Sequence, residues 1–262
     1  MLVKANGIRI NYEFSGKKGS PVVALSHSLG SSLEMWHPQI GILEPHYRIL
    51  RYDTRGHGKT DASTGAYSLE LLTGDVIGLL DALGIETIHF AGLSMGGMIG
   101  QGLALDYPRR LQSLILCDTR SKAPQEGDQA IRERIETARQ KGLEPLLEPT
   151  LERWFTPSFM GKNPRSLDVI RREFLATSVN GYIGCSEALR TLNYRERLHA
   201  VELPTLIVVG EEDPGTPVAA AREIHERIAG SELVIVSSAR HLSNVEQPEA
   251  FNKALIDFLK RH

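Results

Sequence analysis

The sequence has 262 residues, enough for one large α/β domain or two small ones, and its 41% hydrophobic and 24% charged residues are ordinary for a globular protein. A formal net charge of -2, without a run rich in Lys and Arg, argues against a nucleic-acid-binding protein. The first residues turn polar too early for a signal peptide, and no segment reaches the roughly 18 apolar residues of a membrane span. The two cysteines, Cys117 and Cys185, show no spacing typical of a zinc site. We therefore expect a cytoplasmic protein that contains no metal and binds neither nucleic acid nor membranes.

The first half of the chain alternates strand and helix patterns. Residues 2–14 alternate apolar and polar side chains around Asn6-Gly7, which predicts a β-hairpin. Buried strands are predicted over 21–26, 47–52, 88–91 and 111–117, and helical patterns lie between them through Trp36 and Ile42, over 68–83 and over 96–105. Strands that alternate with helices form a mostly parallel, doubly wound sheet, here of about eight strands.

The alternation stops near Ser121, and residues 121–198 are helical in character. It resumes with strands over 204–210 and 232–236, each followed by a helix. We predict one domain, with a core formed by residues 1–120 and 199–262 and a helical cap, residues 121–198, inserted after the sixth strand. Because ligands of open α/β sheets bind at the carboxyl edge, a cap there would form a lid. The alternative is an independent helical domain, but no Gly/Ser/Pro-rich linker flanks the segment.

A glycine-flanked serine lies where a predicted strand runs into a helix. Residues 92–96 read Gly-Leu-Ser-Met-Gly and fit the pattern G-x-S-x-G. A sharp turn of this kind lifts the Ser94 hydroxyl above the sheet edge and aims the next backbone N–H at a developing oxyanion. The alternatives are a plain Gly-rich loop or a phosphate cradle. Neither G-x-G-x-x-G nor a Gly-Lys-Ser/Thr ending is present, which weakens the phosphate interpretation.

Two later residues complete a predicted catalytic triad. A serine needs a base to take its proton, and the base needs an orienting acid. Asp213 follows one predicted parallel strand and His241 follows the next, so both lie at the same edge as Ser94. The chain order Ser, Asp, His is the order found in α/β-hydrolases. Asp118, at the end of another strand, is a second candidate acid, with capping of the turn into the cap as its alternative role.

The loop after the strand over 21–26 is expected to supply one of the N–H donors that stabilise the oxyanion. A tetrahedral intermediate needs two N–H donors, and we expect them from Met95 and from Leu29, with Ser28 as the alternative. His27 begins this loop and competes with His241 as a base, but we expect it to order its own loop by hydrogen bonding. His57, in the turn Arg-Gly-His-Gly, is expected to be structural.

These motifs resemble the α/β-hydrolase superfamily over nearly the whole chain. A narrower resemblance is to 3-oxoadipate enol-lactonases. It is carried by the segments Ser-His-Ser-Leu-Gly at 26–30, Arg-Trp-Phe-Thr-Pro at 153–157, Gly-Tyr-Ile-Gly-Cys at 181–185 and His-Leu-Ser-Asn-Val-Glu-Gln-Pro at 241–248. The resemblance implies an α/β-hydrolase fold and a cofactor-free serine hydrolase. It would open 3-oxoadipate enol-lactone to 3-oxoadipate, in the β-ketoadipate pathway of aromatic catabolism, through an acyl-enzyme on Ser94.

The carboxylate of such a substrate needs a cation, and arginine suits planar two-point recognition. The cap contains Arg132, Arg134, Arg153 and Arg190, and the sequence does not show which of them point inward. We take Arg132 and Arg153 as candidate substrate-binding residues, together with Ser28 and Trp154. A solvated helix face is the alternative for the arginines, and packing within the cap is the alternative for Trp154.

The expected partners are thus a small carboxylated enol-lactone and water as co-substrate, and the sequence leaves assembly into a homo-oligomer open. Three other functions would use the same candidate catalytic residues. They are a general carboxylesterase, a hydrolase of C–C bonds in ring-cleavage products, and a ligand receptor built on a hydrolase fold.

Overall fold

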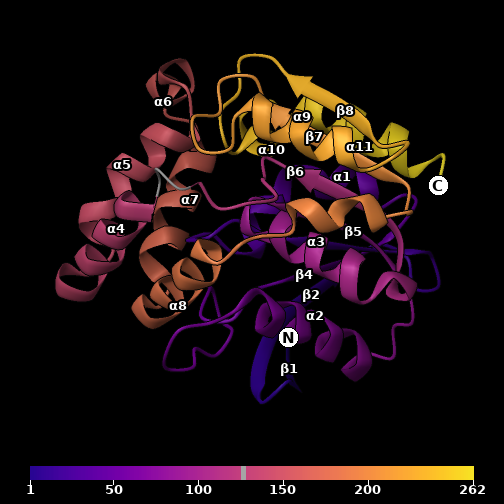
Figure 1. The fold of residues 1–262 in the computed structure, drawn as a ribbon, viewed down its shortest axis with the longest axis horizontal. Coiled ribbons are helices and arrows are strands. Elements are labelled where there is room, and N and C mark those ends of the chain that lie inside the picture. Colours follow the sequence, from indigo (N-terminus) through magenta and orange to yellow (C-terminus); the bar gives the residue numbers. More distant parts are fainter. Residues whose placement is uncertain (125–127) are drawn as a thin grey trace.

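The computed structural model covers the whole chain, and the structure describes residues 1–124 and 128–262. Its centre is one eight-stranded sheet in the order β1-β2-β4-β3-β5-β6-β7-β8 (Figure 1). β1 pairs with β2 and β2 with β4 in antiparallel fashion, and the other neighbouring strands are parallel. The predicted mostly parallel sheet of about eight strands is confirmed. The strands are β1 (Leu2–Ala5), β2 (Ile8–Ser15), β3 (Val22–Ser26), β4 (Arg48–Tyr52), β5 (Ile88–Leu93), β6 (Leu111–Cys117), β7 (Thr205–Gly210) and β8 (Glu232–Val236).

The central strands bury both faces, as their continuous apolar runs predict. In β5, Ile88 and Phe90 pack into the core on one side of the sheet, and Ala91 and Leu93 pack into the core on the other. This alternation follows from the two-residue period of a strand. A shift of one residue in the pairing of a strand would exchange its two faces. The apolar pattern therefore fixes the register of each strand, and with it the residue at which the strand ends at the carboxyl edge.

Helices cover both faces of the sheet. α2 (Leu69–Ala82), α3 (Met95–Asp106) and α9 (Val218–Arg227) contribute to the core on one face, and α1 (His37–Leu43) and α11 (Pro248–Leu259) to the core on the other. Shorter elements are α10 (Ser243–Glu246) and the 3-10 helices η1 (Leu33–Trp36), η2 (Pro108–Arg110) and η3 (Arg195–Ala200). The helical pattern through Trp36 and Ile42 divides into η1 and α1, because Pro38 stands in the first turn of α1 and has no N–H to continue a helix.

In the described part of the chain, five α-helices lie between β6 and β7 and form a body beside the sheet, at the left of Figure 1. We call them the cap helices: α4 (Asp128–Lys141), α5 (Glu144–Trp154), α6 (Pro157–Lys162), α7 (Arg165–Ala176) and α8 (Val179–Arg190). α8 rests on the loop after β4, where a Cβ on Gly56 would overlap the backbone of Gly181. The Ser178 N–H also donates to the Gly56 carbonyl (3.1 Å). We infer that the described residues of the segment 121–198 form the predicted cap on a core made by residues 1–120 and 199–262; residues 125–127 of the predicted cap lie outside the described part of the chain.

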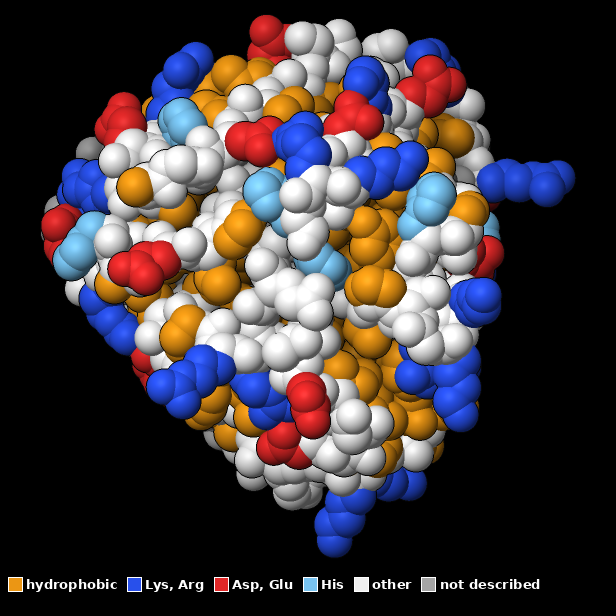
Figure 2. Space-filling model, turned by 90° about the vertical axis from the view of Figure 1, so that its right-hand side faces the viewer, with side chains coloured by type: hydrophobic (Ala, Val, Ile, Leu, Met, Phe, Trp, Pro, Cys, Tyr) orange, Lys and Arg blue, Asp and Glu red, His pale blue; other side chains and the backbone are white. Residues whose placement is uncertain are grey.

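Figure 2 shows the face at the right-hand side of Figure 1, away from the cap helices. Lys and Arg side chains lie there among Asp and Glu side chains, with apolar side chains between them. Within residues 1–124 and 128–262, no helix has both the length and the apolar character needed to cross a membrane.

Candidate active site

Ser94 occupies a strained turn between β5 and α3. Its backbone has φ 56° and ψ -112°, a conformation that a non-glycine residue adopts only when its surroundings enforce it. Two hydrogen bonds do so: the Ser94 N–H donates to the Cys117 carbonyl (2.8 Å), and the Thr119 hydroxyl donates to the Ser94 carbonyl (2.8 Å). A Cβ on Gly92 would overlap the Gly96 carbonyl, so the motif needs glycine there. The predicted elbow is present in the structure.

Asp213 and His241 form a buried hydrogen-bonded pair at the same edge. His241 Nδ1 lies 2.7 Å from Asp213 Oδ2. Asp213 also accepts from the N–H groups of Gly215 (2.7 Å) and Thr216 (3.0 Å) and from the Thr216 hydroxyl (2.5 Å). Burial opposes the ionisation of Asp213, but the charge of His241 and these hydrogen bonds outweigh it and lower its pKa. An ionised Asp213 can only accept, so His241 carries its proton on Nδ1 and leaves Nε2 as a base.

Asp118, the alternative acid, lies in a different environment. Its carboxyl group is fully buried, accepts from the Gly210 N–H (2.7 Å) and lies 2.6 Å from the Ser243 hydroxyl. Burial, reinforced by the charge of Asp213, raises its pKa well above the usual value. The two environments therefore shift the pKa values of the two acids in opposite directions, which favours the ionised form of Asp213 and the neutral form of Asp118. Asp118 ties the ends of β6 and β7 to α10, so its suggested role in capping the turn into the cap is wrong.

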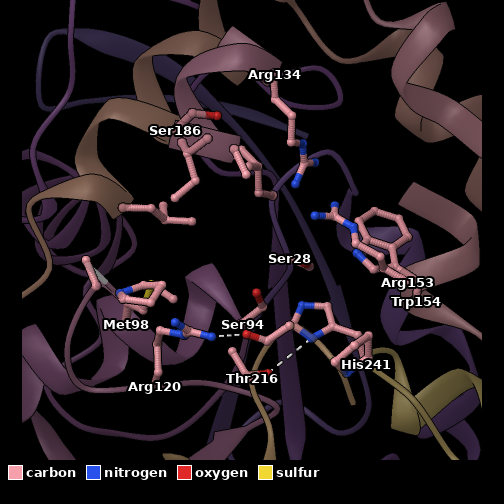
Figure 3. A pocket seen from close by; sticks show the side chains of 18 of the residues that line it. Ser28, Ser94, Met98, Arg120, Arg134, Arg153, Trp154, Ser186, Thr216 and His241 are labelled. Carbon is pink, nitrogen blue, oxygen red and sulfur yellow. Dashed lines mark hydrogen bonds between the residues drawn. The ribbon is translucent and has the colours of Figure 1, made fainter. Parts of the chain in front are cut away.

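Ser94 and His241 face one cavity of about 390 Å³, at the small end of ligand sites in proteins (Figure 3). Among the described residues, no hydrogen bond joins the Ser94 hydroxyl to His241. Such contacts often tighten only when substrate is bound, so the shared cavity is the informative feature. No group of His, Cys, Asp and Glu in the described part of the chain could hold a metal ion.

One expected oxyanion donor lines this cavity, and the other directly follows Ser94, which lines it. Met95 is the first residue of α3, where helix N–H groups have no acceptor within the helix. Leu29 lines the cavity. Within residues 1–124 and 128–262, neither N–H donates to another backbone group, whereas the N–H of the adjacent Gly30 donates to His57 Nε2 (2.9 Å). The two N–H groups expected for an oxyanion are thus available beside Ser94.

Two buried histidines hold the loop that carries Leu29. His27 Nδ1 lies 2.7 Å from the Ser28 carbonyl, and its Nε2 accepts from the Thr54 N–H (2.9 Å). His57 repeats the arrangement, with Nδ1 3.1 Å from the Arg55 carbonyl and Nε2 accepting from Gly30. Burial lowers the pKa of His27 to about 4, and burial with the neighbouring His27 lowers that of His57 to about 3. Both rings are therefore neutral and structural, as expected for both from the sequence.

This pair makes stability dependent on pH. In the unfolded chain both histidines take up a proton near pH 6.5, but in the folded protein they do so only near pH 4 and 3. Stability is therefore fully present above pH 6.5 and falls as the pH drops toward 4, by about 2 kcal/mol per histidine at pH 5. We expect the loss of unfolding free energy between pH 7 and 5 to be about 2 kcal/mol smaller in His57→Gln than in the unsubstituted protein.

Urea unfolding at the two pH values measures this difference. The matched control is His199→Gln, because His199 is exposed on η3 and its substitution should leave the pH dependence unchanged. An equal loss of unfolding free energy between pH 7 and 5 in His57→Gln and in the unsubstituted protein would show that His57 does not cause this pH dependence.

The cap helices and the strand ends line the cavity together. Besides Ser94 and His241, the lining includes the predicted residues Ser28, Leu29, Arg153 and Trp154, and also Arg134, one of the cap arginines considered from the sequence. Trp154 also packs edge-on against Phe174 in the cap, at 6.0 Å between ring centres. The sequence reasoning did not single out other lining residues, among them Arg120, Tyr182, Ser186 and Thr216.

The structure does not place Arg132, a predicted substrate-binding residue, in the cavity. Its side chain is 59% exposed and pairs with Asp128 (2.6 Å), and it does not line the cavity. The inward face of α4 instead carries Ile131 and Arg134, three residues apart, and the 3.6-residue period turns position 132 outward. Arg190 likewise pairs outside the cavity, with Asp128 and Glu187.

Arg153 and Arg134 enter the cavity from the cap side (Figure 3). Arg134 donates to the Tyr182 hydroxyl (2.6 Å). Burial, and next the charge of Arg134, lower the pKa of Arg153 to about 10, which leaves it cationic at neutral pH. In the described part of the chain neither guanidinium lies within 4.0 Å of a carboxylate. This wall of the cavity therefore holds positive charge that an anionic ligand would neutralise.

Glu246 joins the cap to the loop of His241. Its buried carboxylate accepts from the N–H (2.8 Å) and hydroxyl (2.5 Å) of Thr156, which follows α5, and from the Arg240 N–H (2.8 Å). The Leu242 N–H donates to the Trp154 carbonyl (3.2 Å). The residues on both sides of His241 are thus bonded to the segment that carries Arg153 and Trp154.

Comparison with known proteins agrees with this geometry. The family model of the alpha/beta hydrolase fold matches residues 21–248. 3-Oxoadipate enol-lactonase 2 of Acinetobacter baylyi is 38% identical over 257 residues, covering 98% of this chain and 95% of that protein. A protein of Agrobacterium fabrum named as a carbamate hydrolase, RutD, is 29% identical, covering 95% and 98%. The crystal structure of the enol-lactonase from Burkholderia xenovorans LB400 is 38% identical with a TM-score of 0.96, covering 99% and 100%. The chain therefore belongs to the α/β-hydrolase family, is a hydrolase, and is similar over nearly its whole length to 3-oxoadipate enol-lactonases.

Proposed function

We propose that this hydrolase opens 3-oxoadipate enol-lactone to 3-oxoadipate, as a step of the β-ketoadipate pathway. The observation that supports it best is a small cavity with Ser94 and His241 on one wall and the unpaired guanidinium of Arg153 on another, within the described residues. Such a cavity suits a small ester that carries a carboxylate. The similarity to enol-lactonases supports the same substrate.

The chemistry follows from the placement of the groups. His241 Nε2 takes the proton of Ser94 as the serine oxygen attacks the lactone carbonyl, and Asp213 stabilises the imidazolium that forms. The N–H groups of Met95 and Leu29 bind the oxyanion. The ring C–O bond breaks, the enol oxygen takes the proton from His241, and the enol tautomerises to a ketone. His241 then removes a proton from water as the water attacks the acyl-enzyme. The bond to the Ser94 oxygen breaks, His241 returns the proton to that oxygen, and the acid leaves. The reaction needs no cofactor.

Arg153 is the residue we assign to the carboxylate of the substrate, with Arg134 beside it and Ser28 and Trp154 in the wall. A partly buried guanidinium without a counter-charge gains most from a ligand that supplies one. Since the carboxylate is remote from the reacting carbonyl, its binding energy is the same in the ground state and the transition state.

Arg153→Gln is therefore expected to raise KM for the enol-lactone by about 10- to 100-fold and to change kcat little. Steady-state kinetics with the lactone and with a neutral aryl acetate measure the effect. The neutral ester lacks the carboxylate and should be hydrolysed as before. Arg132→Gln, an exposed arginine of the same cap, is the matched control and should leave both substrates unaffected. An equal loss for both substrates would show that Arg153 acts on the fold of the cap instead.

A substrate panel tests the proposed function as a whole. The purified protein is assayed with 3-oxoadipate enol-lactone, an aryl ester, a ring-cleavage product with a C–C bond to hydrolyse, and a carbamate. We expect the highest kcat/KM for the enol-lactone. Faster turnover of the aryl ester, the ring-cleavage product or the carbamate would replace the proposed substrate with that class. A single turnover followed by arrest would favour a ligand receptor. The cytoplasmic location and the state of assembly stay predictions.

A further inference from the structure

A third arginine lines the cavity from the side opposite Arg153. Figure 3 shows Arg120 near Ser94 and Met98, across the cavity from Arg134 and Arg153. Arg120 stands three residues after the end of β6, directly after Thr119, whose hydroxyl binds the Ser94 carbonyl. It therefore reaches the cavity from the catalytic edge of the sheet, whereas the other two arginines reach it from the cap.

Backbone contacts hold Arg120 in this position. Its guanidinium donates to the Gly215 carbonyl, in the loop of the triad acid, and its own carbonyl accepts from Gln101 Nε2 (2.9 Å). One backbone acceptor occupies one of the five N–H donors of a guanidinium. Among the described residues, no carboxylate lies within 4.0 Å of Arg120.

Asp213 is the acid whose charge acts on Arg120, but its carboxylate already has other hydrogen-bond partners. The Asp213 oxygens accept from Gly215, Thr216 and His241, and they orient the base. Three guanidinium groups thus line the cavity, and among the described residues no Asp or Glu side chain lines it. A ligand with a single carboxylate at Arg153 would leave the positive charge at Arg120 unmatched. On the face away from the cap, by contrast, charges of both signs intermingle (Figure 2).

We propose that Arg120 forms a second anion subsite beside Ser94, so that the cavity binds short-chain dicarboxylates with one carboxylate at Arg153 and the other at Arg120. This inference rests on the proposed function, because opening the lactone creates a second carboxylate at the carbon that Ser94 attacked. The substrate carries one negative charge and the product two. The second subsite makes the product a tighter ligand than the substrate, and it favours diacids over monoacids as inhibitors.

Isothermal calorimetry with adipate and its monoamide, adipamate, tests the proposal. The two probes have the same length and shape, but adipamate has one carboxylate replaced by a neutral amide. We expect the protein to bind adipate about tenfold or more tightly than adipamate, because hydrogen bonds between charged groups are roughly twice as strong as neutral ones. In Arg120→Gln this ratio should fall to within about twofold of unity. Arg120→Lys retains the charge and should keep a preference for adipate.

The ratio is measured within each variant, so a general loss of affinity does not imitate the effect. Arg132→Gln controls for the loss of one positive charge from the protein and should keep the full ratio. An unchanged ratio in Arg120→Gln, or equal affinity of the unsubstituted protein for the two probes, would overturn the second subsite.

Turnover of the enol-lactone is measured separately and distinguishes the two proposals. Strong preference for adipate without turnover of the lactone would leave the subsite standing and refute the substrate. Efficient turnover of the lactone without preference for adipate would refute the second subsite and leave the proposed substrate standing.

Discussion

Replacing Ser94 by alanine is expected to lower kcat by about five orders of magnitude and to leave the fold intact. The hydroxyl is the group that would form the acyl-enzyme, and the remaining groups give only the slow reaction that an oxyanion hole and binding support. The strained backbone at φ 56° is set by the hydrogen bonds of the Ser94 N–H and carbonyl, which alanine also makes. Single-turnover kinetics with the enol-lactone, beside circular dichroism, measure both effects.

Ser186→Ala is the matched control, since Ser186 lines the same cavity and its hydroxyl donates to the Tyr182 carbonyl (2.7 Å) within α8. Its rate should stay within a few-fold of the unsubstituted protein. If Ser94→Ala retained the normal rate with a normal spectrum, Ser94 would not be the nucleophile.

Asp213→Asn is expected to lower kcat about 10⁴-fold, because an amide facing His241 Nδ1 no longer holds the proton there. The two neighbouring acids make a sharper comparison. Burial raises the pKa of Asp118 well above its usual value and so favours its neutral form, which asparagine resembles. Asparagine can still accept from the Gly210 N–H, and the Ser243 hydroxyl, which donates to Asp118, can rotate to accept from the amide. Asp118→Asn should therefore keep a rate within a few-fold of normal. Steady-state kinetics of both variants at neutral pH provide the measurement, and a reversed pattern would make Asp118 the orienting acid.

The fold could be predicted from local patterns because each strand carries its own signal. The apolar runs of β3, β5, β6 and β7 predict strands buried on both faces, and the chain between them is long enough for a crossover helix. Parallel strands end at one edge, so Ser94, Asp213 and His241 could be placed together without any knowledge of distances. The structure brings these three residues to that edge.

The lining of the cavity could not be predicted in the same way. Whether Arg132 or Arg134 points inward depends on how α4 rotates against the other cap helices, and the polar surface of α4 gives little indication. Arg120 was missed although it follows a strand at the catalytic edge, a position that could have identified it. The hydrogen bonds of His27 and His57 join segments far apart in the chain, and no local pattern encodes them.

The hydrogen bonds of Glu246 limit how the cap can be exchanged between related hydrolases. Its carboxylate bonds the cap at Thr156 and the backbone next to the catalytic histidine at Arg240, so a change of cap is transmitted directly to the base. The cap is therefore not an exchangeable module with a free boundary at its two ends in the sequence. A chimaera that takes its cap from a related hydrolase should retain activity only if the residues equivalent to Thr156 and Glu246 are inherited from the same parent.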